Sequence, residues 1–163
     1  MSKPSLSYYQ SLPKKRMASG VILRNERGEM LVLKTSYKNH WEIPGGVVEE
    51  NESPVAAAER EVREEIGLQI KITSCLVIHY RSAQNSQDEN IMFTFDGGIV
   101  TDHHALSLDQ KEIIETKFVS FREAMPLVGE RIGSRLPFCE QALREGKTIY
   151  LESIANIEPS FIS

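Results

Sequence analysis

The stretch from Gly46 to Leu68, GVVEENESPVAAAEREVREEIGL, decides how this chain folds and what it can bind. Glu61, Glu64 and Glu65 recur at spacings of three and four residues, so on a helix they fall within an arc of about 100°. Like charges at these spacings destabilise a helix by roughly 0.2–0.5 kcal/mol per pair. Oxygen ligands of this kind suit Mg²⁺ or Mn²⁺. The pattern therefore predicts a divalent-cation site on a helix.

The boundaries of this helix can be read from the same stretch. Ser53 suits the N-cap position, and Pro54 suits the first helical residue. Gly67 stands where a glycine commonly ends a helix. One face of the helix is apolar and adjoins the acidic face, so the helix can pack on a sheet while it presents its carboxylates to a cleft. The residues expected on the apolar face are Val55, Ala58, Val62 and Ile66.

The same run resembles the Nudix box, G-x5-E-x7-R-E-U-x-E-E-x-G-U, in which U is aliphatic. Every constrained position matches: Gly46, Glu52, Arg60, Glu61, Val62, Glu64, Glu65, Gly67 and Leu68. The preceding residues 41–46, WEIPGG, are similar to the W-x-x-P-G-G segment that leads into the box in that family. The resemblance extends over about residues 17 to 122.

The resemblance implies an α+β fold, the Nudix α/β/α sandwich, in which a mixed β-sheet carries the box helix on one side. It also implies a hydrolase that uses Mg²⁺, or Mn²⁺, to cleave a nucleoside diphosphate linked to another group. Carried over by position, the metal ligands would be the Gly46 carbonyl and the carboxylates of Glu61, Glu64 and Glu65. Arg60 would pair with the motif glutamate Glu52, and it stands four residues before Glu64, which it can orient.

Four further residues are candidates for the site. Glu112 and Glu115 are alternatives for the carboxylate that removes a proton from the attacking water. We favour Glu112, because it precedes the predicted strand and a loop residue reaches a site more freely. Lys34 can contact a phosphate, although a surface lysine is the commoner role. Trp41 can stack on a base or anchor a loop. His103 and His104 are interpreted as part of a solvated loop.

The substrate follows only by elimination. The chain lacks the marks outside the box that accompany hydrolysis of ADP-ribose, NADH, coenzyme A and diadenosine polyphosphates. It therefore resembles the MutT-like group, whose substrates are nucleoside triphosphates or related small nucleotides. The alternatives are a nucleotide-binding sensor or scaffold without activity, or an enzyme that acts on ADP-ribose, a dinucleotide or a nucleotide sugar.

Composition agrees with a small phosphorylated substrate. The chain has 163 residues and a net charge of −4, which disfavours binding of long nucleic acids. The N-terminus has no apolar core of a secretory signal, and no stretch is apolar enough to span a membrane. We expect a cytoplasmic protein. The oligomeric state stays open, although small sandwich domains of this type often form homodimers.

Periodicity and turn residues predict the remaining organisation. We expect a loose N-terminal arm over residues 1–16, one domain over 17–153 and a C-terminal tail over 154–163. The predicted strands are Met17–Arg24, Glu29–Thr35, Ile70–Ser82, Ile91–Val100, Glu115–Phe121 and Thr148–Glu152. The predicted helices after the box are Arg122–Val128 and Leu136–Glu145.

Overall fold

A single mixed sheet with helices on both faces forms the framework of the molecule. The computed structural model describes residues 5–83, 88–101, 106–108, 110–154 and 160–162. Its strands are β1 (Arg16–Arg24), β2 (Met30–Thr35), β3 (Trp41–Glu42), β4 (Gly45–Val47), β5 (Ser74–Arg81), β6 (Asn90–Ile99), β7 (Ile113–Val119), β8 (Ile149–Ser153) and β9 (Ser160–Ile162). Its helices are α1 (Leu6–Ser11), α2 (Pro54–Ile66), α3 (Phe121–Leu127), α4 (Glu130–Gly133) and α5 (Leu136–Glu145).

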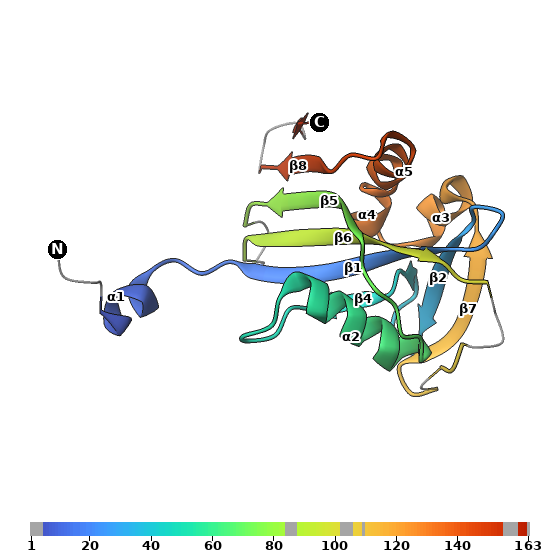
Figure 1. Cartoon of the computed structure of the whole chain (residues 1–163), viewed down its shortest axis with the longest axis horizontal. Helices are drawn as coiled ribbons and strands as arrows, with labels where there is room; N and C mark the ends of the chain where they lie inside the picture. The colour runs from blue at the N-terminus through green and yellow to red at the C-terminus, as the bar shows by residue number, and fades with distance from the viewer. Residues whose placement is uncertain (1–4, 84–87, 102–105, 109, 155–159, 163) are drawn as a thin grey trace.

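The strand order confirms the predicted sandwich. The strands run β3-β2-β1-β6-β5-β8-β9, with β4 also paired to β1 and β7 to β2. The pairs β1–β6 and β5–β8 are parallel and the others are antiparallel, so the sheet is mixed. Helix α2 lies in front of the sheet in Figure 1, and α3, α4 and α5 pack on its other face. The chain therefore has the α+β, α/β/α architecture expected from its sequence.

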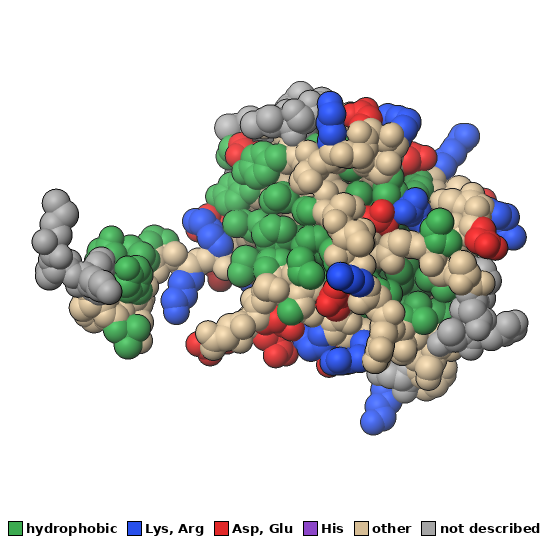
Figure 2. Space-filling model, in the orientation of Figure 1, with side chains coloured by type: hydrophobic (Ala, Val, Ile, Leu, Met, Phe, Trp, Pro, Cys, Tyr) green, Lys and Arg blue, Asp and Glu red, His purple; other side chains and the backbone are tan. Residues whose placement is uncertain are grey.

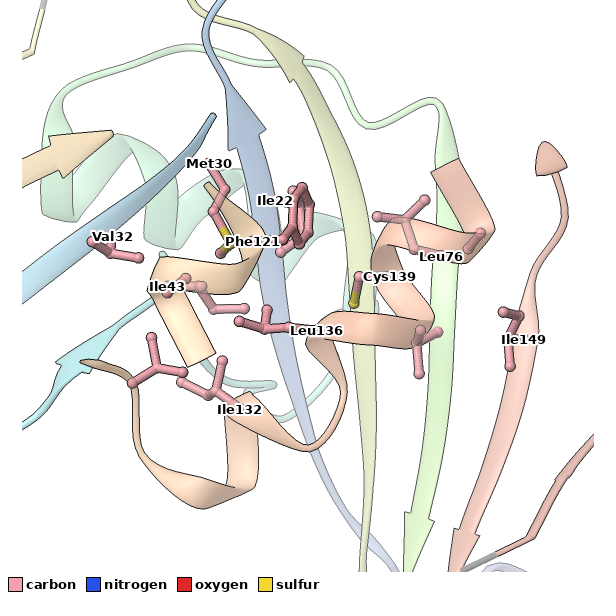
Figure 3. Close-up of a cluster of buried hydrophobic side chains, with 14 of the residues drawn as sticks. Ile22, Met30, Val32, Ile43, Leu76, Phe121, Ile132, Leu136, Cys139 and Ile149 are labelled. Carbon is pink, nitrogen blue, oxygen red and sulfur yellow. The ribbon is translucent and has the colours of Figure 1, made fainter. Parts of the chain in front are cut away.

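Each face of the sheet has its own apolar core. On the α2 face, Ala58, Val62 and Ile66 pack against β1, β2 and β6. On the other face, Leu136, Cys139 and Ala142 of α5 pack against residues of the sheet. Figure 3 shows this second core, in which Ile43 and Ile132 approach from the loop before β4 and from α4. The two apolar cores pack against the central strands from both faces, so the strand ends near β4 are held in a fixed position.

Strand β1 shares one of its edges between two partners. Near its end it pairs with β2 at Arg24 and Met30, and near its start it pairs with β4, where Ser19 lies opposite Gly46. Strand β2 instead pairs along its length with β7. The predicted hairpin of the first two strands therefore closes only near the turn, and the segment that carries β3 and β4 enters the gap between β1 and β2.

Helix α2 begins and ends where the sequence predicts. Ser53 Oγ accepts the Ala56 N–H at 3.1 Å, and Gly67 ends the helix with φ 72°. The buried face differs from the prediction, because Val55 is 39% exposed while Ala57 is buried. The first turn is held against β1 by Ser19 Oγ, which donates to Pro54 O at 2.6 Å, and there the small Ala57 faces inward.

Two predicted strands differ from the structure by two or more residues at an end. Strand β7 covers Ile113–Val119 rather than Glu115–Phe121, because Ser120 and Glu123 form a capping box that begins α3 at Phe121. Strand β5 begins at Ser74 rather than Ile70, because Glu59 of α2 accepts the Ile72 N–H at 3.0 Å and holds that segment beside the helix. Helix α5 is confirmed, and β8 begins and ends one residue later than predicted.

The two ends of the chain contain short elements that the sequence did not predict. Helix α1 lies within the expected arm and has no buried residue, and Figure 2 shows its apolar side chains apart from the main body. Strand β9 lies within the expected tail and pairs with β8. In the described part of the chain, no helix has both the length and the apolar character needed to cross a membrane.

His79 is a buried titratable group in β5. It is 3% exposed, its Nε2 lies 2.9 Å from Ser153 Oγ, and its Nδ1 has no hydrogen-bond partner. Burial, reinforced by the charges of Arg135 and Arg81, lowers the pKa of His79 from 6.5 to about 4. The neutral imidazole is thus the form that the fold accommodates.

This burial predicts acid sensitivity. Between the folded pKa of about 4 and the ordinary 6.5, the unfolded chain binds more protons at His79, so the free energy of unfolding falls as the pH is lowered. The change should reach roughly 2 kcal/mol between about pH 7 and about pH 4.5. Urea unfolding of wild type and of His79→Gln measures it. The free energy of unfolding is plotted against pH for both proteins, and the difference between the two slopes gives the contribution of His79. Equal slopes would contradict the prediction.

Candidate active site

The acidic face of α2 lies against β4. The Gly45 N–H donates to Glu65 Oε2 at 2.9 Å. A Cβ atom placed on Gly46 would overlap the carboxylate of Glu61, so glycine lets the backbone lie against this carboxylate in its present position. Strand β4 and helix α2 therefore bring the backbone of Gly45 and Gly46 close to two of the box carboxylates, and their role as metal ligands stays a prediction.

Arg60 links the loop before the helix to the carboxylates on it. Its Nε and Nη2 donate to the two oxygens of Glu52 at 2.9 and 3.0 Å. Its Nη1 donates to Glu61 at 2.8 Å and to Glu64 at 3.1 Å, while Nη2 also contacts the Val47 carbonyl at 3.1 Å. These contacts raise the pKa of Arg60 and lower that of Glu52. The predicted pairs with Glu52 and Glu64 are present, so Arg60 positions the box carboxylates.

Negative charge accumulates around Glu65. Burial is the main cause that raises the pKa of Glu65 to about 8, and the carboxylates of Glu61, Glu112 and Glu42 raise it further. The Gly45 N–H opposes this effect. Carboxylates that disfavour one another's ionisation in this way fit a site whose resident group is a cation. Among the described residues, no three potential ligands already form a coordination shell, so the side chains would have to turn toward a shared ion.

The two candidates for the additional carboxylate occupy different places. Glu112 lies directly before β7, and its Oε1 accepts a hydrogen bond from the Tyr37 hydroxyl at 2.6 Å. This contact is the main cause that raises the pKa of Tyr37 to about 12. Glu115 lies inside β7, where it is exposed and opposite Lys34 of β2. Glu112, but not Glu115, is among the carboxylates that raise the pKa of Glu65.

A cavity of about 570 Å³ opens beside β4 on the face of the sheet that carries α4 and α5. Gly46 lines it, and so do Ile43 and Ile132 from the apolar core. Four arginines also line it: Arg16, Arg81, Arg131 and Arg135. No sequence pattern predicted a role for these arginines, because they come from three separate regions of the chain and belong to no motif.

Of the predicted site residues that the structure describes, only Gly46 lines this cavity, and the lining does not include Arg60, Glu61, Glu64, Glu65, Glu112, Glu115, Lys34 or Trp41. The Lys34 ammonium donates to the Lys38 carbonyl at 2.9 Å. Trp41 packs against the apolar core on the α5 face, and the Lys117 ammonium lies 4.2 Å from its ring centre. These contacts match the anchoring role that the sequence left open for Trp41. His103 and His104 lie outside the described residues.

Comparison with protein families identifies the box and its surroundings as one domain. The model of the NUDIX domain matches residues 14–137. The chain is 35% identical over 86 residues to an 8-oxo-dGTP diphosphatase of Proteus vulgaris, which covers 50% of this chain and 73% of that protein. It is 43% identical over 49 residues to an RNA pyrophosphohydrolase of Marinomonas sp. (strain MWYL1). This second match spans 30% of each protein, so it covers less than a third of the relative's length.

Solved structures share the fold. The chain is similar to the MutT protein from Methanosarcina mazei Go1, with a TM-score of 0.64, 28% identity, and coverage of 85% of this chain and 100% of that one. It also superposes on a UDP-X diphosphatase with a TM-score of 0.72 over 93% of this chain and 77% of that one. At 15% identity, the second likeness concerns the fold alone.

Proposed function

This chain belongs to the NUDIX domain family, and we propose that it hydrolyses the pyrophosphate linkage of a small nucleotide with Mg²⁺ as its cofactor. Nucleoside or deoxynucleoside triphosphates are the favoured substrates. The observation that carries the proposal is the approach of α2 to β4, where the Gly45 N–H donates to Glu65 and the Glu61 carboxylate lies against Gly46. The charges of Glu61, Glu112 and Glu42 also raise the pKa of Glu65. The names of the 8-oxo-dGTP diphosphatase and MutT relatives support the substrate class.

The residues present fit a divalent cation. Glu61, Glu64 and Glu65 would hold it together with the Gly46 carbonyl, because the Gly46 backbone lies directly against the Glu61 carboxylate. Oxygen ligands and remaining waters are the coordination that Mg²⁺ prefers, and Mn²⁺ can use the same set. A bound cation would neutralise charge on the phosphates and on the leaving oxygen.

The chain's own side chains supply the rest of the reaction. Glu112 would accept a proton from the attacking water, and its carboxylate is held by the Tyr37 hydroxyl. Glu115 remains the alternative base. Arg60 would act as a positioning residue, because its contacts with Glu52, Glu61 and Glu64 fix the ligand helix relative to the preceding loop.

A nucleotide-binding module without activity is the competing function. It would need the cavity but not the complete set of box residues. Incubation of the protein with Mg²⁺ and a panel of nucleotides, with phosphate and pyrophosphate release measured, distinguishes the two. The panel includes nucleoside triphosphates, 8-oxo-dGTP, ADP-ribose, a dinucleoside polyphosphate and a nucleotide sugar. Binding without release of product would favour the module.

Activity should depend on the cation. Excess EDTA should abolish turnover, and Mg²⁺ or Mn²⁺ should restore it. Without a cation, neither the carboxylates nor the substrate phosphates have their negative charge neutralised. The cation should also raise the melting temperature, since it binds the folded state. Product release and thermal unfolding, each measured with EDTA and after addition of Mg²⁺, test this. Full activity in excess EDTA would disprove the assignment.

A further inference from the structure

Four arginines from three separate regions of the sequence surround the cavity beside β4. Arg16 at the start of β1 and Arg81 at the end of β5 both lie opposite Asn90 of β6, so three neighbouring strands place these side chains in one row. Arg131 comes from α4, and Arg135 is the residue before α5. The sheet and the helical layer thus direct positive charge toward one space.

This charge is not balanced by the protein. Five lysines and arginines line the cavity but only two carboxylates do, in a chain whose net charge is −4. One of the carboxylates, Glu42, already accepts hydrogen bonds from Lys38 and from His40. The other, Glu130, is exposed. Among the residues that the structure describes, none of the four arginines forms an ion pair.

Arg135 gives the strongest indication that this cavity suits an anion. It is 3% exposed, and its buried Nε has no hydrogen-bond partner. Burial lowers the pKa of Arg135 to about 10, and burial together with the charge of Arg131 lowers the pKa of Arg81. A buried guanidinium without a partner is costly, and a bound anion removes that cost.

The arginine row and the segment proposed to hold the metal are offset along β1 by an interval that leaves room for two separate phosphate groups. Arg16 precedes Ser19, the partner of Gly46, by three residues of β1, which corresponds to about 10 Å along a strand. Neighbouring phosphorus atoms in a diphosphate are much closer than that. The interval instead suits the sugar of a nucleotide. Guanidinium groups are well matched to phosphate oxygens.

We propose that the four arginines bind a second phosphate of the substrate, one nucleoside away from the diphosphate that is cleaved. This inference rests on the proposed function and narrows its substrate to nucleotides that carry a further phosphate on the sugar, such as a 3′-phosphate. The same chemistry occurs in the first internucleotide phosphate of a 5′-triphosphorylated oligonucleotide. The experiment below separates these two sources.

The first measurement does not need catalysis. Inorganic phosphate is titrated into the protein in EDTA, at constant ionic strength, and the melting temperature is followed. Phosphate also stabilises proteins non-specifically, so the informative quantity is the difference between variants. Arg81→Gln and Arg131→Gln should lose most of the stabilisation, whereas Arg144→Gln, on the exposed part of α5, should retain it. Equal stabilisation of all four proteins would overturn the proposal.

The second measurement compares substrates in Mg²⁺. A 3′-phosphate on a nucleoside 5′-triphosphate should lower KM by about tenfold or more for wild type, and Arg81→Gln and Arg131→Gln should remove this advantage while kcat changes little. A larger advantage for a 5′-triphosphorylated dinucleotide would assign the arginines to an oligonucleotide end. Hydrolysis with no advantage for either compound would refute the inference alone. Absence of hydrolysis for every compound would instead refute the proposed function.

Discussion

Replacing Glu64 or Glu65 with glutamine should lower kcat by at least about 100-fold while the protein remains folded. Glutamine keeps the size and hydrogen-bonding shape of the side chain but removes the charge that would bind the cation. Glu64 is largely exposed, with its side chain 54% accessible, so its loss should cost the fold little. Glu65→Gln should also remain folded, because the amide oxygen of glutamine can still accept the hydrogen bond from the Gly45 N–H.

Steady-state kinetics and urea unfolding of both variants test this result. Glu140→Gln, an exposed glutamate of α5 on the other face of the sheet, is the matched control and should retain wild-type turnover. If Glu64→Gln were unfolded, Glu64 would have a structural role instead. Retention of full turnover by both variants would remove the box carboxylates from the mechanism.

The same substitution at Glu65 should alter the pH dependence of stability in EDTA. The folded pKa of Glu65 is about 8, above its ordinary 4.5, so its contribution to stability is lost as the pH rises through this window. Glutamine does not titrate, and Glu65→Gln should therefore be more stable than wild type at about pH 8. The comparison is made without metal, because a bound cation reverses the preference for the neutral acid.

Local signals in the sequence were sufficient for α2 but not for its surroundings. Ser53, Pro54 and Gly67 act on backbone groups of neighbouring residues, so they predicted both ends of the helix. Ser120 and Glu123 carry the same kind of local signal, and reading them as a capping box would have ended β7 at Val119. Val55 shows where local reasoning fails, because its exposure depends on how β1 holds the first turn of the helix.

The arginines around the cavity are beyond local reasoning altogether. Arg16 and Arg81 meet only because β6 lies between β1 and β5, and this neighbour relation belongs to the sheet topology. Likewise, β3 and β4 are too short to show strand periodicity, and they form because the gap between β1 and β2 offers them unpaired edges. The sequence indicated the candidate metal site because its carboxylates lie on one helix, whereas the cavity combines residues from several separate regions of the chain.

The carboxylate that activates water should be Glu112 rather than Glu115. Glu112 lies close enough to Glu65 to raise its pKa, and the Tyr37 hydroxyl fixes it at the start of β7. Glu115 lies opposite Lys34 within the strand and does not contribute to the shift of Glu65. Glu112→Gln should thus lower kcat by about 100-fold or more, on the scale of losing general-base catalysis, while Glu115→Gln should stay near wild type.

Binding of the cation provides the necessary second measurement. Glu112→Gln should retain wild-type affinity for Mn²⁺, followed by calorimetry, because Glu112 is outside the set of proposed ligands. Its pH–rate profile should lose the acidic limb that reports deprotonation of the base, and Glu115→Gln should keep that limb. The reverse pattern would assign the base to Glu115. Near wild-type rates in both variants would mean that a box glutamate or the cation alone activates the water, and the assignment of Glu112 would then be wrong.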